Sequence, residues 1–397
     1  MNVLIISPNN FPNGDAGALR DLSFAKIYME LGYTVSCICN NTQHTEGEYQ
    51  GIKYRSLYLP KNNKWQKIKN YISYKDRFKE VLHEIESKTG KPDVIHIYDI
   101  PSSAIKYLIR YARKNNVTLI HDSVEWYSPC EFKMGRFDKA YILKDRLNRF
   151  LIKQPIKVIA ISKYLEKHFN SKNLTTVRIP VILDVKEITP KSEVQREKLQ
   201  IVYAGSPAKK DYLKEVIEGV YLLPKELRDK IMFHIIGVNE QQLVTMCGCD
   251  KTMVASLTNC IKPYGRLPRE EVLSILKEMD FSVLLRPPTE RYAMAGFPTK
   301  VVEGLSNSIP MMCNITSDLG DYLHDQENAI IVDDCSSQAI RMALEKALSC
   351  SESDLMHMKQ AARRTAEQYF DYRVYITSVA QILKSEIGSN SKKINDF

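Results

Sequence analysis

The feature that most constrains this fold is an alternation of short apolar strand patterns with helical patterns. Residues VLIIS (3–7) form a β-branched apolar run between Asn and Pro, which is typical of a buried parallel strand. A helical pattern, ALRDLSFAKIYMEL (18–31), follows, with Asp15 as its expected N-cap and Gly32 as its stop signal. YTVSCIC (33–39) is strand-like again, so we expect the chain to open with a βαβ unit.

The alternation runs to residue 185 and restarts after residue 197. Further strand patterns of the first block lie at 93–100, 117–123 and 157–164. Those of the second block lie at 199–206, 231–238, 281–287, 309–314 and 329–334. The segment between the blocks, 186–197, is polar and carries a Pro, which makes it the best linker candidate.

Two alternating blocks predict an α/β fold with two Rossmann-like, doubly wound domains facing a central cleft. In such domains ligands bind beyond the carboxyl ends of the strands. The loops expected to carry function are therefore those that follow strands: 8–17, 98–103, 121–130, 205–211, 237–241 and 286–300.

Composition excludes several classes of protein. With 44% hydrophobic and 26% charged residues, the chain is globular rather than disordered. The first residues lack a positively charged n-region, so we expect no secretory signal, and no apolar stretch approaches the roughly 18 residues of a membrane span. The nine cysteines include no CxxC pair, so we expect free thiols and no metal site.

Positive charge is concentrated in the first block. Residues 1–185 hold 29 Lys and Arg against 18 Asp and Glu, a net charge of +11, whereas the remainder holds 27 against 29. The segment KNNKWQKIKNYISYKDRFK (61–79) combines seven cations and several aromatic residues with one acid. An anionic bilayer or a polyphosphate would suit this pattern, and a solvated helix face is the alternative. We expect no nucleic-acid partner, because no recognised reader motif is present.

Two glycine-bearing loops are candidate anion sites. Gly14 and Gly17 lie at the start of the first helix, where backbone N–H groups can bind an anion; ordinary loop geometry is the alternative. In the second block Gly205 closes a strand, and Lys209 and Lys210 begin the next helix. Cations at the positive end of a helix dipole are locally unfavourable, so a diphosphate is expected beside them. Solvent-facing lysines are the alternative.

The segment AGFPTKVVE (295–303) carries the sharpest expectation. A tight turn at Gly296 and Phe297 is expected to lead into a helix whose first residue is Pro298. The residues expected to hold the diphosphate share this turn and the first helical turn: Gly296, Phe297, Pro298, Thr299 and Lys300. Glu303, farther along, is expected to accept hydrogen bonds from ribose hydroxyls, with a capping or surface acid as the alternative.

On these residues the chain resembles retaining GT-B glycosyltransferases of family 4, of the bacterial surface-polysaccharide type. Their signature has two glutamates eight positions apart around a Gly-Phe-Gly/Pro turn, then a small-x-Gly-x-Pro segment. Gly296-Phe297-Pro298 and Glu303 match it, and LSNSIP (305–310) fills the later segment. AGSPAKKD (204–211) resembles a shortened form of the family's Gly-Arg-Lys loop. The resemblance extends over nearly the whole chain.

Two positions depart from the family pattern. Ala295 replaces the first glutamate, so the carboxylate expected to contact the donor sugar is missing, and Glu290 is the nearest acid before it. Ser206 replaces the arginine that normally follows the loop glycine. Lys209 or Lys210, together with Lys300, is then expected to balance the diphosphate.

The resemblance also implies roles outside the two main motifs. Gly17 is expected to approach the phosphates and Gly237 to lie where the base packs. His121 is expected to reach the donor sugar, with a packed strand-end histidine as the alternative. Glu125 and Trp126 are acceptor-side candidates, and simple packing of the Trp is the alternative. Catalysis is expected to depend on His121, Lys210 and Glu303.

The resemblance divides the chain as follows: an acceptor-side domain at 1–185, a linker at 186–197, and a nucleotide-sugar-binding domain at 198–368. A C-terminal helix at 369–388 is expected to rejoin the first domain, and 389–397 to be a disordered tail. The implied partners are a nucleotide diphosphate sugar, a glycan or lipid-linked acceptor, and an anionic membrane surface. No cofactor and no tightly bound metal are expected. The implied location is the cytoplasm, at the inner face of the membrane.

The implied reaction is transfer of a hexosyl group to an acceptor hydroxyl with retention, in capsule, exopolysaccharide or lipopolysaccharide synthesis. Three alternatives remain open. Ala295 admits a non-catalytic nucleotide-binding homologue. A nucleotide-sugar epimerase could share the two-domain plan, although no convincing acid and base pair is present. A dinucleotide oxidoreductase lacks its glycine fingerprint here.

Overall fold

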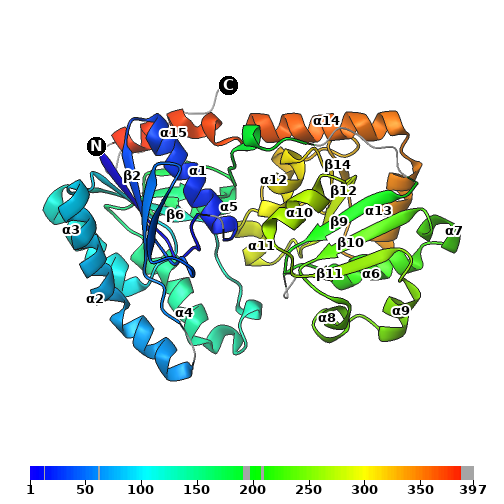
Figure 1. Cartoon of the computed structure of the whole chain (residues 1–397), viewed down its shortest axis with the longest axis horizontal. Coiled ribbons are helices and arrows are strands. Elements are labelled where there is room, and N and C mark those ends of the chain that lie inside the picture. The colour runs from blue at the N-terminus through cyan, green and yellow to red at the C-terminus, as the bar shows by residue number, and fades with distance from the viewer. Residues whose placement is uncertain (13, 61–62, 191–196, 207–209, 386–397) are drawn as a thin grey trace. The chain divides into compact units, whose positions relative to one another are not determined.

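The protein forms two α/β units in the computed structural model, which describes all residues except 13, 61–62, 191–196, 207–209 and 386–397. The first unit comprises Met1–Leu183 with the chain from Tyr372 onward, and the second comprises Asp184–Asp371 (Figure 1). The expected division fell after residue 185. The expected tail, 389–397, lies outside the described residues.

The first unit is built on an eight-stranded sheet in the order β3-β4-β2-β1-β5-β6-β7-β8. Only the β3–β4 pairing is antiparallel. The strands are β1 Asn2–Ile6, β2 Thr34–Cys39, β3 Glu46–Tyr49, β4 Ile52–Ser56, β5 Val94–Ile97, β6 Thr118–Ser123, β7 Lys157–Ala160 and β8 Thr176–Arg178. The helices are α1 Ala16–Glu30, α2 Lys64–Thr89, α3 Ser102–Asn115, α4 Lys139–Arg146, α5 Lys163–Asn170 and α15 Ile376–Lys384.

Local signals in the sequence position α1 as predicted. Asp15 accepts a hydrogen bond from the backbone N–H of Ala18, and Gly32 has a φ of 81° just after the helix, so the predicted N-cap and stop signal are confirmed. Phe24 and Tyr28 of α1 pack on the sheet together with Val379 and Ile382 of α15. The crossover through α3 runs the opposite way along the sheet, so α3 and α2 cover the other face (Figure 1).

The second unit has a six-stranded, fully parallel sheet in the order β11-β10-β9-β12-β13-β14. Its strands are β9 Leu199–Ala204, β10 Ile231–Ile236, β11 Ile261–Gly265, β12 Phe281–Leu284, β13 Met311–Cys313 and β14 Ala329–Ile331. Its helices are α6 Leu213–Leu222, α7 Lys225–Arg228, α8 Glu240–Thr245, α9 Lys251–Ser256, α10 Arg269–Leu276, α11 Arg291–Ala295, α12 Thr299–Ser306, α13 Ser337–Ser349 and α14 Glu352–Tyr369.

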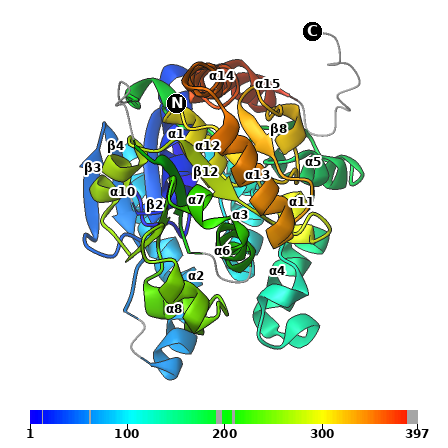
Figure 2. The same cartoon turned by 90° about the vertical axis from the view of Figure 1, so that its right-hand side faces the viewer.

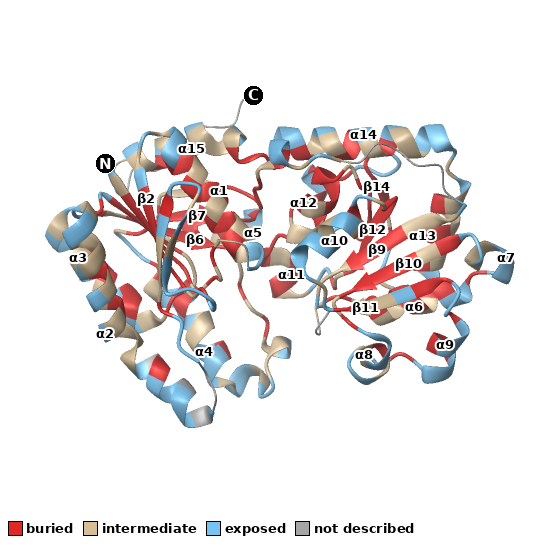
Figure 3. Cartoon of the chain, viewed as in Figure 1, coloured by how far each residue is buried: buried red, intermediate tan, exposed pale blue. Residues whose placement is uncertain are grey.

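Close packing fixes the helices of this second unit. A Cβ at Gly219 of α6 would lie 2.3 Å from Cγ2 of Ile340 on α13, so the two helices lie side by side (Figure 2). Most strands of both sheets are buried, whereas β3, β4 and β8 are partly exposed, and the helices present exposed outer faces (Figure 3). This is the pattern expected for parallel sheets covered on both sides.

The start of the expected linker is held by the second unit. Arg363 of α14 donates hydrogen bonds to the carbonyls of Val185 and Ile188, at 3.0 and 2.8 Å. The described residues after Leu183 are therefore tied to α14, which explains why the division falls slightly before the polar segment.

Candidate functional site

Two strand ends and one helix meet in the second unit. Gly205 follows β9 with a φ of 142°, and Gly237 follows β10 with a φ of 109°. A Cβ at Gly237 would lie 2.2 Å from the carbonyl oxygen of Gly205, and a Cβ at Gly205 would lie 2.4 Å from Cε of Lys300. Only glycine fits the conformation and the spacing at these positions. They bring the predicted residues Gly205, Gly237 and Lys300 together.

Lys300, in the first turn of α12, is paired with a buried carboxylate. Its Nζ contacts one oxygen of Asp211 and donates a hydrogen bond to the Tyr203 hydroxyl at 2.8 Å. The Nε of Arg286, which follows β12, donates to the other oxygen of Asp211 at 2.9 Å. We call Tyr203, Asp211, Arg286 and Lys300 the Asp211 cluster.

Electrostatics stabilise the charged form of this carboxylate. Burial alone would raise the pKa of Asp211, but the charges of Lys300 and Arg286 outweigh burial and lower it. Burial lowers the pKa of Lys300, and the nearby Asp211 partly offsets this. The Lys300 and Arg286 side chains are 18% and 16% exposed, so a ligand can still reach both cations.

Sequence reasoning found Lys300 but missed the other members of the Asp211 cluster. Asp211 directly follows Lys209 and Lys210 in the sequence, and Arg286 directly precedes two prolines, so neither matched a motif. The available signal was their position, because each follows a strand of the second block. The backbone of Arg286 is also fixed, since its N–H donates to Asn314 Oδ1 at 2.9 Å and its carbonyl accepts from Asn314 Nδ2 at 2.7 Å.

Glu303 lies on the same helix as Lys300. Its Oε1 accepts two long hydrogen bonds from Arg269, at 3.3 and 3.4 Å, and its side chain is 26% exposed. Burial raises the pKa of Glu303, and Arg269 counteracts part of that effect. A carboxylate held this loosely can exchange Arg269 for other donors.

Other predicted donor-side residues have different surroundings. Helix α12 begins at Thr299 with Pro298 as N-cap, so the prediction that Pro298 is the first helical residue is wrong by one position. Gly296 ends the short helix α11. Phe297 packs against Tyr322 and Phe370, with ring centroids 5.7 and 5.6 Å away, and so belongs to the core.

Lys209 and Lys210 were expected to begin the next helix, but α6 begins at Leu213, so that prediction is wrong for Lys210. The Lys210 carbonyl accepts a hydrogen bond from the Tyr292 hydroxyl at 3.2 Å, and its Nζ lies 5.7 Å from the centre of that ring. Lys210 is therefore held beside α11. Lys209 lies outside the described residues.

The predicted residues of the first unit fall into two groups. His121 at the end of β6 and Glu125 line one small cavity. Burial lowers the pKa of His121 to about 4, so its imidazole is neutral at pH 7. Gly17 lies apart in α1, where a Cβ would be 2.4 Å from Oδ1 of Asn9.

Trp126 is a packing residue. It is 5% exposed, and its Nε1 donates to Asp145 Oδ1 at 2.9 Å. His168 lies 4.4 Å from the indole by ring centroids, and the Arg149 guanidinium lies 5.2 Å from it. The hypothesis that this ring offers an open face to an acceptor is therefore wrong, and the packing alternative holds.

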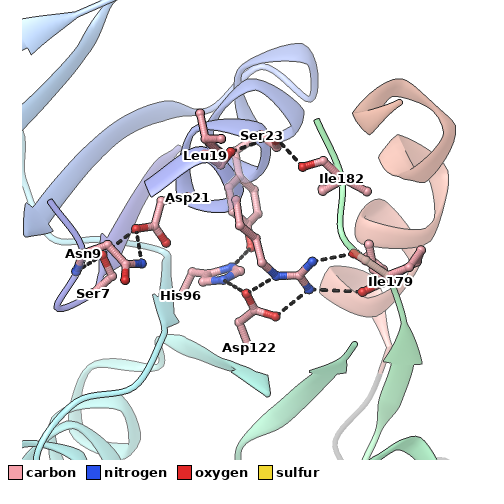
Figure 4. A network of polar contacts seen from close by, with 12 residues as sticks. Ser7, Asn9, Leu19, Asp21, Ser23, His96, Asp122, Ile179 and Ile182 are labelled. Atoms are coloured by element: carbon pink, nitrogen blue, oxygen red, sulfur yellow. Dashed lines mark hydrogen bonds and ion pairs between the residues drawn. The ribbon is translucent and has the colours of Figure 1, made fainter. Parts of the chain in front are cut away.

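A buried polar network includes Asp122, the residue that follows His121 on β6 (Figure 4). Arg20 of α1 donates two hydrogen bonds to the Asp122 carboxylate, at 2.6 and 2.8 Å. His96 lies 3.8 Å from Asp122, and its Nδ1 is 2.9 Å from the Tyr28 hydroxyl. Burial would raise the pKa of Asp122, but Arg20 dominates and lowers it to about 2. Neither Arg20 nor Asp122 was predicted from the sequence as a site residue.

A second buried carboxylate, Asp21, completes this region (Figure 4). It accepts hydrogen bonds from the Ser7 hydroxyl at 2.5 Å and from Asn9 Nδ2 at 2.8 Å. Burial nevertheless raises its pKa to about 7. Its carboxyl group is thus poised between the protonated and ionised forms near neutral pH.

The described part of the chain contains neither a cluster of metal ligands nor a membrane-spanning helix. No group of three His, Cys, Asp or Glu side chains there is placed to hold a metal ion. None of the helices outside the gaps at 13, 61–62, 191–196, 207–209 and 386–397 is both long and apolar enough to cross a bilayer.

The second unit has a counterpart among known protein families. Residues 184–365 match glycosyl transferases group 1. This match covers the strand ends and helix that carry the Asp211 cluster and Glu303. The match lies within the second unit and covers less than half of the chain.

Individual relatives agree with this match. The uncharacterized glycosyltransferase MJ1069 of Methanocaldococcus jannaschii is 21% identical over 251 residues, which is 60% of each chain. The amylovoran biosynthesis glycosyltransferase AmsK of Erwinia amylovora is 26% identical over 136 residues, 34% of this chain and 33% of its own. The chain thus spans less than two thirds of each of these curated relatives.

A solved structure supports the fold of the whole chain. The Anabaena protein Alr3699/HepE in complex with UDP-glucose has a TM-score of 0.66 and 14% identity, covering 97% of this chain and all of its own. These structural matches and the two sheets of mainly parallel strands confirm the predicted fold class of two Rossmann-like domains.

Proposed function

We propose that this chain is a retaining glycosyltransferase of the family 4 type, which moves a hexosyl group from a nucleotide diphosphate sugar to an acceptor hydroxyl. The Asp211 cluster carries the proposal. It lies at the ends of strands in the unit that matches glycosyl transferases group 1. Loops at the carboxyl ends of parallel strands are where doubly wound domains bind nucleotides.

The donor diphosphate would bind between the Asp211 cluster and the start of α12. Lys300 and Arg286 outnumber the single carboxylate of Asp211, so the cluster keeps one positive charge in excess. The N-terminus of α12, where Pro298 makes no side-chain cap hydrogen bond, adds partial positive charge. When the bond to the sugar breaks, charge grows on the departing diphosphate, and fixed cations stabilise it.

Other residues would orient the donor. Glu303 would exchange Arg269 for ribose hydroxyls, because its present hydrogen bonds are long. Gly237 would leave room for the base. A neutral His121 would form a hydrogen bond with the sugar, since its low pKa excludes an imidazolium at pH 7. Lys210 would add charge near the phosphates, and no metal is required in this scheme.

The acceptor would be a glycan or lipid-linked intermediate of surface-polysaccharide synthesis, reached at the cytoplasmic face of a membrane. AmsK, a relative over a third of the chain, is named for amylovoran biosynthesis. On α2, Trp65 and Ile72 are 82% and 72% exposed, and Lys69 lies between them in the sequence. Exposed apolar residues beside cations suit a peripheral contact with anionic lipid.

Isotope transfer tests the activity. The full chain would be incubated with a radiolabelled UDP-, GDP- or ADP-sugar panel, with and without lipid extracted from a polysaccharide-producing bacterium. We expect label from one donor to enter the lipid fraction, and nuclear magnetic resonance of that product to report a retained anomeric configuration. The proposal would be contradicted if no donor of the panel gave any transfer of label and none was hydrolysed, even slowly.

One observation favours a second candidate function, a nucleotide-binding homologue without turnover. Ala295 is fully buried in α11 and supplies no carboxylate where the family pattern places a sugar-binding glutamate. Nucleotide binding without transfer or hydrolysis in the same assay would identify this alternative.

A further inference from the structure

A large cavity lies in the first unit, and none of its lining residues belongs to the second unit. Its volume is about 580 Å³, within the usual size range of small-molecule sites. It lies beside the ends of β1, β2, β4 and β5, and helices α2 and α4 supply further walls (labels in Figure 1). Most of the wall is apolar, with side chains such as Leu57, Leu59, Ile100, Leu143 and Leu147.

The wall also contains a guanidinium group that is only partly satisfied. Arg77 of α2 donates to the carbonyls of Leu57 and Asn70, at 2.8 and 3.2 Å. Its Nε is buried and has no hydrogen-bond partner. No ion pair joins Arg77 to any carboxylate of the described residues. A buried guanidinium nitrogen without a hydrogen-bond partner is costly, and an anionic ligand that accepts from it would remove that cost.

A small polar cavity adjoins the large one. The two share Asp99, Lys144 and Leu147 as lining residues, and Lys144 is ion-paired with Asp99 at the junction. The small cavity is lined by His121 and Ser123, whose Nδ1 and Oγ are buried without a partner. An apolar chamber thus leads to a polar one with unused hydrogen-bonding groups.

We propose that the paired cavities bind an amphiphilic acceptor, with its alkyl or isoprenoid chain along the apolar wall, a phosphate at Arg77, and a hydroxyl directed to the small cavity. The acceptor role rests on the proposed function, whereas the binding of an anionic amphiphile does not. The mixture of apolar wall and cation argues for this class, because a plain sugar would bury its hydroxyls against leucine side chains without partners.

Calorimetric titration of the full chain, without nucleotide, tests this proposal. The probes are dodecyl phosphate below its micelle concentration, inorganic phosphate, and dodecyltrimethylammonium. We expect dodecyl phosphate to bind at least about tenfold more tightly than either of the other probes. Only this probe has both an alkyl chain for the apolar wall and a phosphate for Arg77. Equal binding of the two dodecyl compounds would overturn the role of Arg77. Equal binding of inorganic phosphate would overturn the role of the apolar wall.

Matched variants locate the binding. Ala140 lines the cavity from an exposed position on α4, so Ala140→Trp fills the space without disturbing the core. Ile142→Trp places the same side chain at an exposed position of α4 that does not line the cavity. We expect Ala140→Trp to weaken dodecyl phosphate binding about tenfold and Ile142→Trp to leave it unchanged. Unchanged binding in Ala140→Trp would overturn the assignment of the cavity.

The outcome is distinguishable from failure of the proposed function. Circular dichroism of each variant reports its folding, and a nucleotide titration reports the second unit separately. If the chain binds dodecyl phosphate in this cavity but transfers no sugar, the amphiphile site stands and the transferase proposal fails. If the chain transfers sugar to a water-soluble acceptor but does not bind dodecyl phosphate, the transferase proposal stands and the amphiphile site fails.

Discussion

At the scale of single residues, three buried carboxylates illustrate how environment sets charge. Asp122 is held ionised by Arg20, and Asp211 by Lys300 and Arg286. Asp21 has no cation among its hydrogen-bond partners and is protonated up to about pH 7. The sequence could not separate these cases, because the partners of Asp122 and Asp211 lie 102 and 75 to 89 positions away in the chain.

Asp21 predicts a specific dependence of stability on pH. Its folded pKa of about 7 lies above its unfolded value, so the folded state binds the extra proton between about pH 4 and pH 7. Relative to Asp21→Asn, the wild type is expected to lose stability as pH rises through this window, by up to roughly 1.4 kcal/mol per unit. Urea denaturation of both proteins across the window measures the difference.

Comparing the wild type with Asp21→Asn removes the contributions of other titrating groups to the pH dependence of stability. His121 has a folded pKa of about 4, below its unfolded value, so its contribution to stability is lost as pH falls from about 6.5 to 4. That change occurs in both proteins and cancels in the difference. A difference in the free energy of unfolding that is constant with pH would contradict the assignment for Asp21.

At the scale of elements, the sequence predicts strands and their order of appearance better than it predicts side-chain partners. The apolar runs at 3–7 and 33–39 correspond to β1 and β2, because buried parallel strands need such runs. The hairpin of β3 and β4 was missed, since its strands are half exposed and carry charges. Helix α11 was also missed, because residues 286–300 were predicted to form one loop before the turn at Gly296 and Phe297.

The loop after β9 yields a test of the candidate donor site. Gly205→Ala would place a methyl group where Lys300 now lies and would strain a φ of 142°. We expect about tenfold weaker nucleotide binding, because Lys300 must move. Fluorescence titration with the best nucleoside diphosphate measures it.

Gly248→Ala is the matched control for that substitution. Gly248 also has a positive φ, 75°, but a Cβ there would meet nothing within 4 Å. Both variants should lose about 1–2 kcal/mol of stability through backbone strain, and only Gly205→Ala should lose nucleotide affinity. Equal losses of affinity in the two variants would show that strain alone is responsible.

At the scale of the whole molecule, the two units differ in charge balance and in the candidate sites that they contain. The first unit contains the basic block, the exposed apolar residues of α2 and the paired cavities. The second contains the family match and the Asp211 cluster. Charge asymmetry and the strand-end loops were visible in the sequence. The cavities were not, because they depend on how α2 and α4 pack beside the sheet.

This division predicts membrane binding that depends on the first unit and on salt. The full chain should bind vesicles containing phosphatidylglycerol, and about 0.5 M salt should release it by screening. The double variant Trp65→Ala/Ile72→Ala should bind several-fold more weakly, whereas Met246→Ala, at an exposed apolar residue of the second unit, should bind as the wild type does. Vesicle flotation measures all three, and salt-insensitive binding would count against the electrostatic account.

Nucleotide binding to the second unit is the most direct test of the central claim. UDP, GDP and ADP would be compared with their monophosphates in thermal unfolding of the wild type, Lys300→Met, Lys210→Ala and Glu303→Ala. The account predicts that one nucleoside diphosphate raises the unfolding temperature of the wild type more than its monophosphate does. It also predicts that Lys300→Met abolishes the difference, because the Asp211 cluster then lacks the cation that meets the diphosphate. If no nucleotide stabilises the wild type, or Lys300→Met responds as the wild type does, the donor site lies elsewhere.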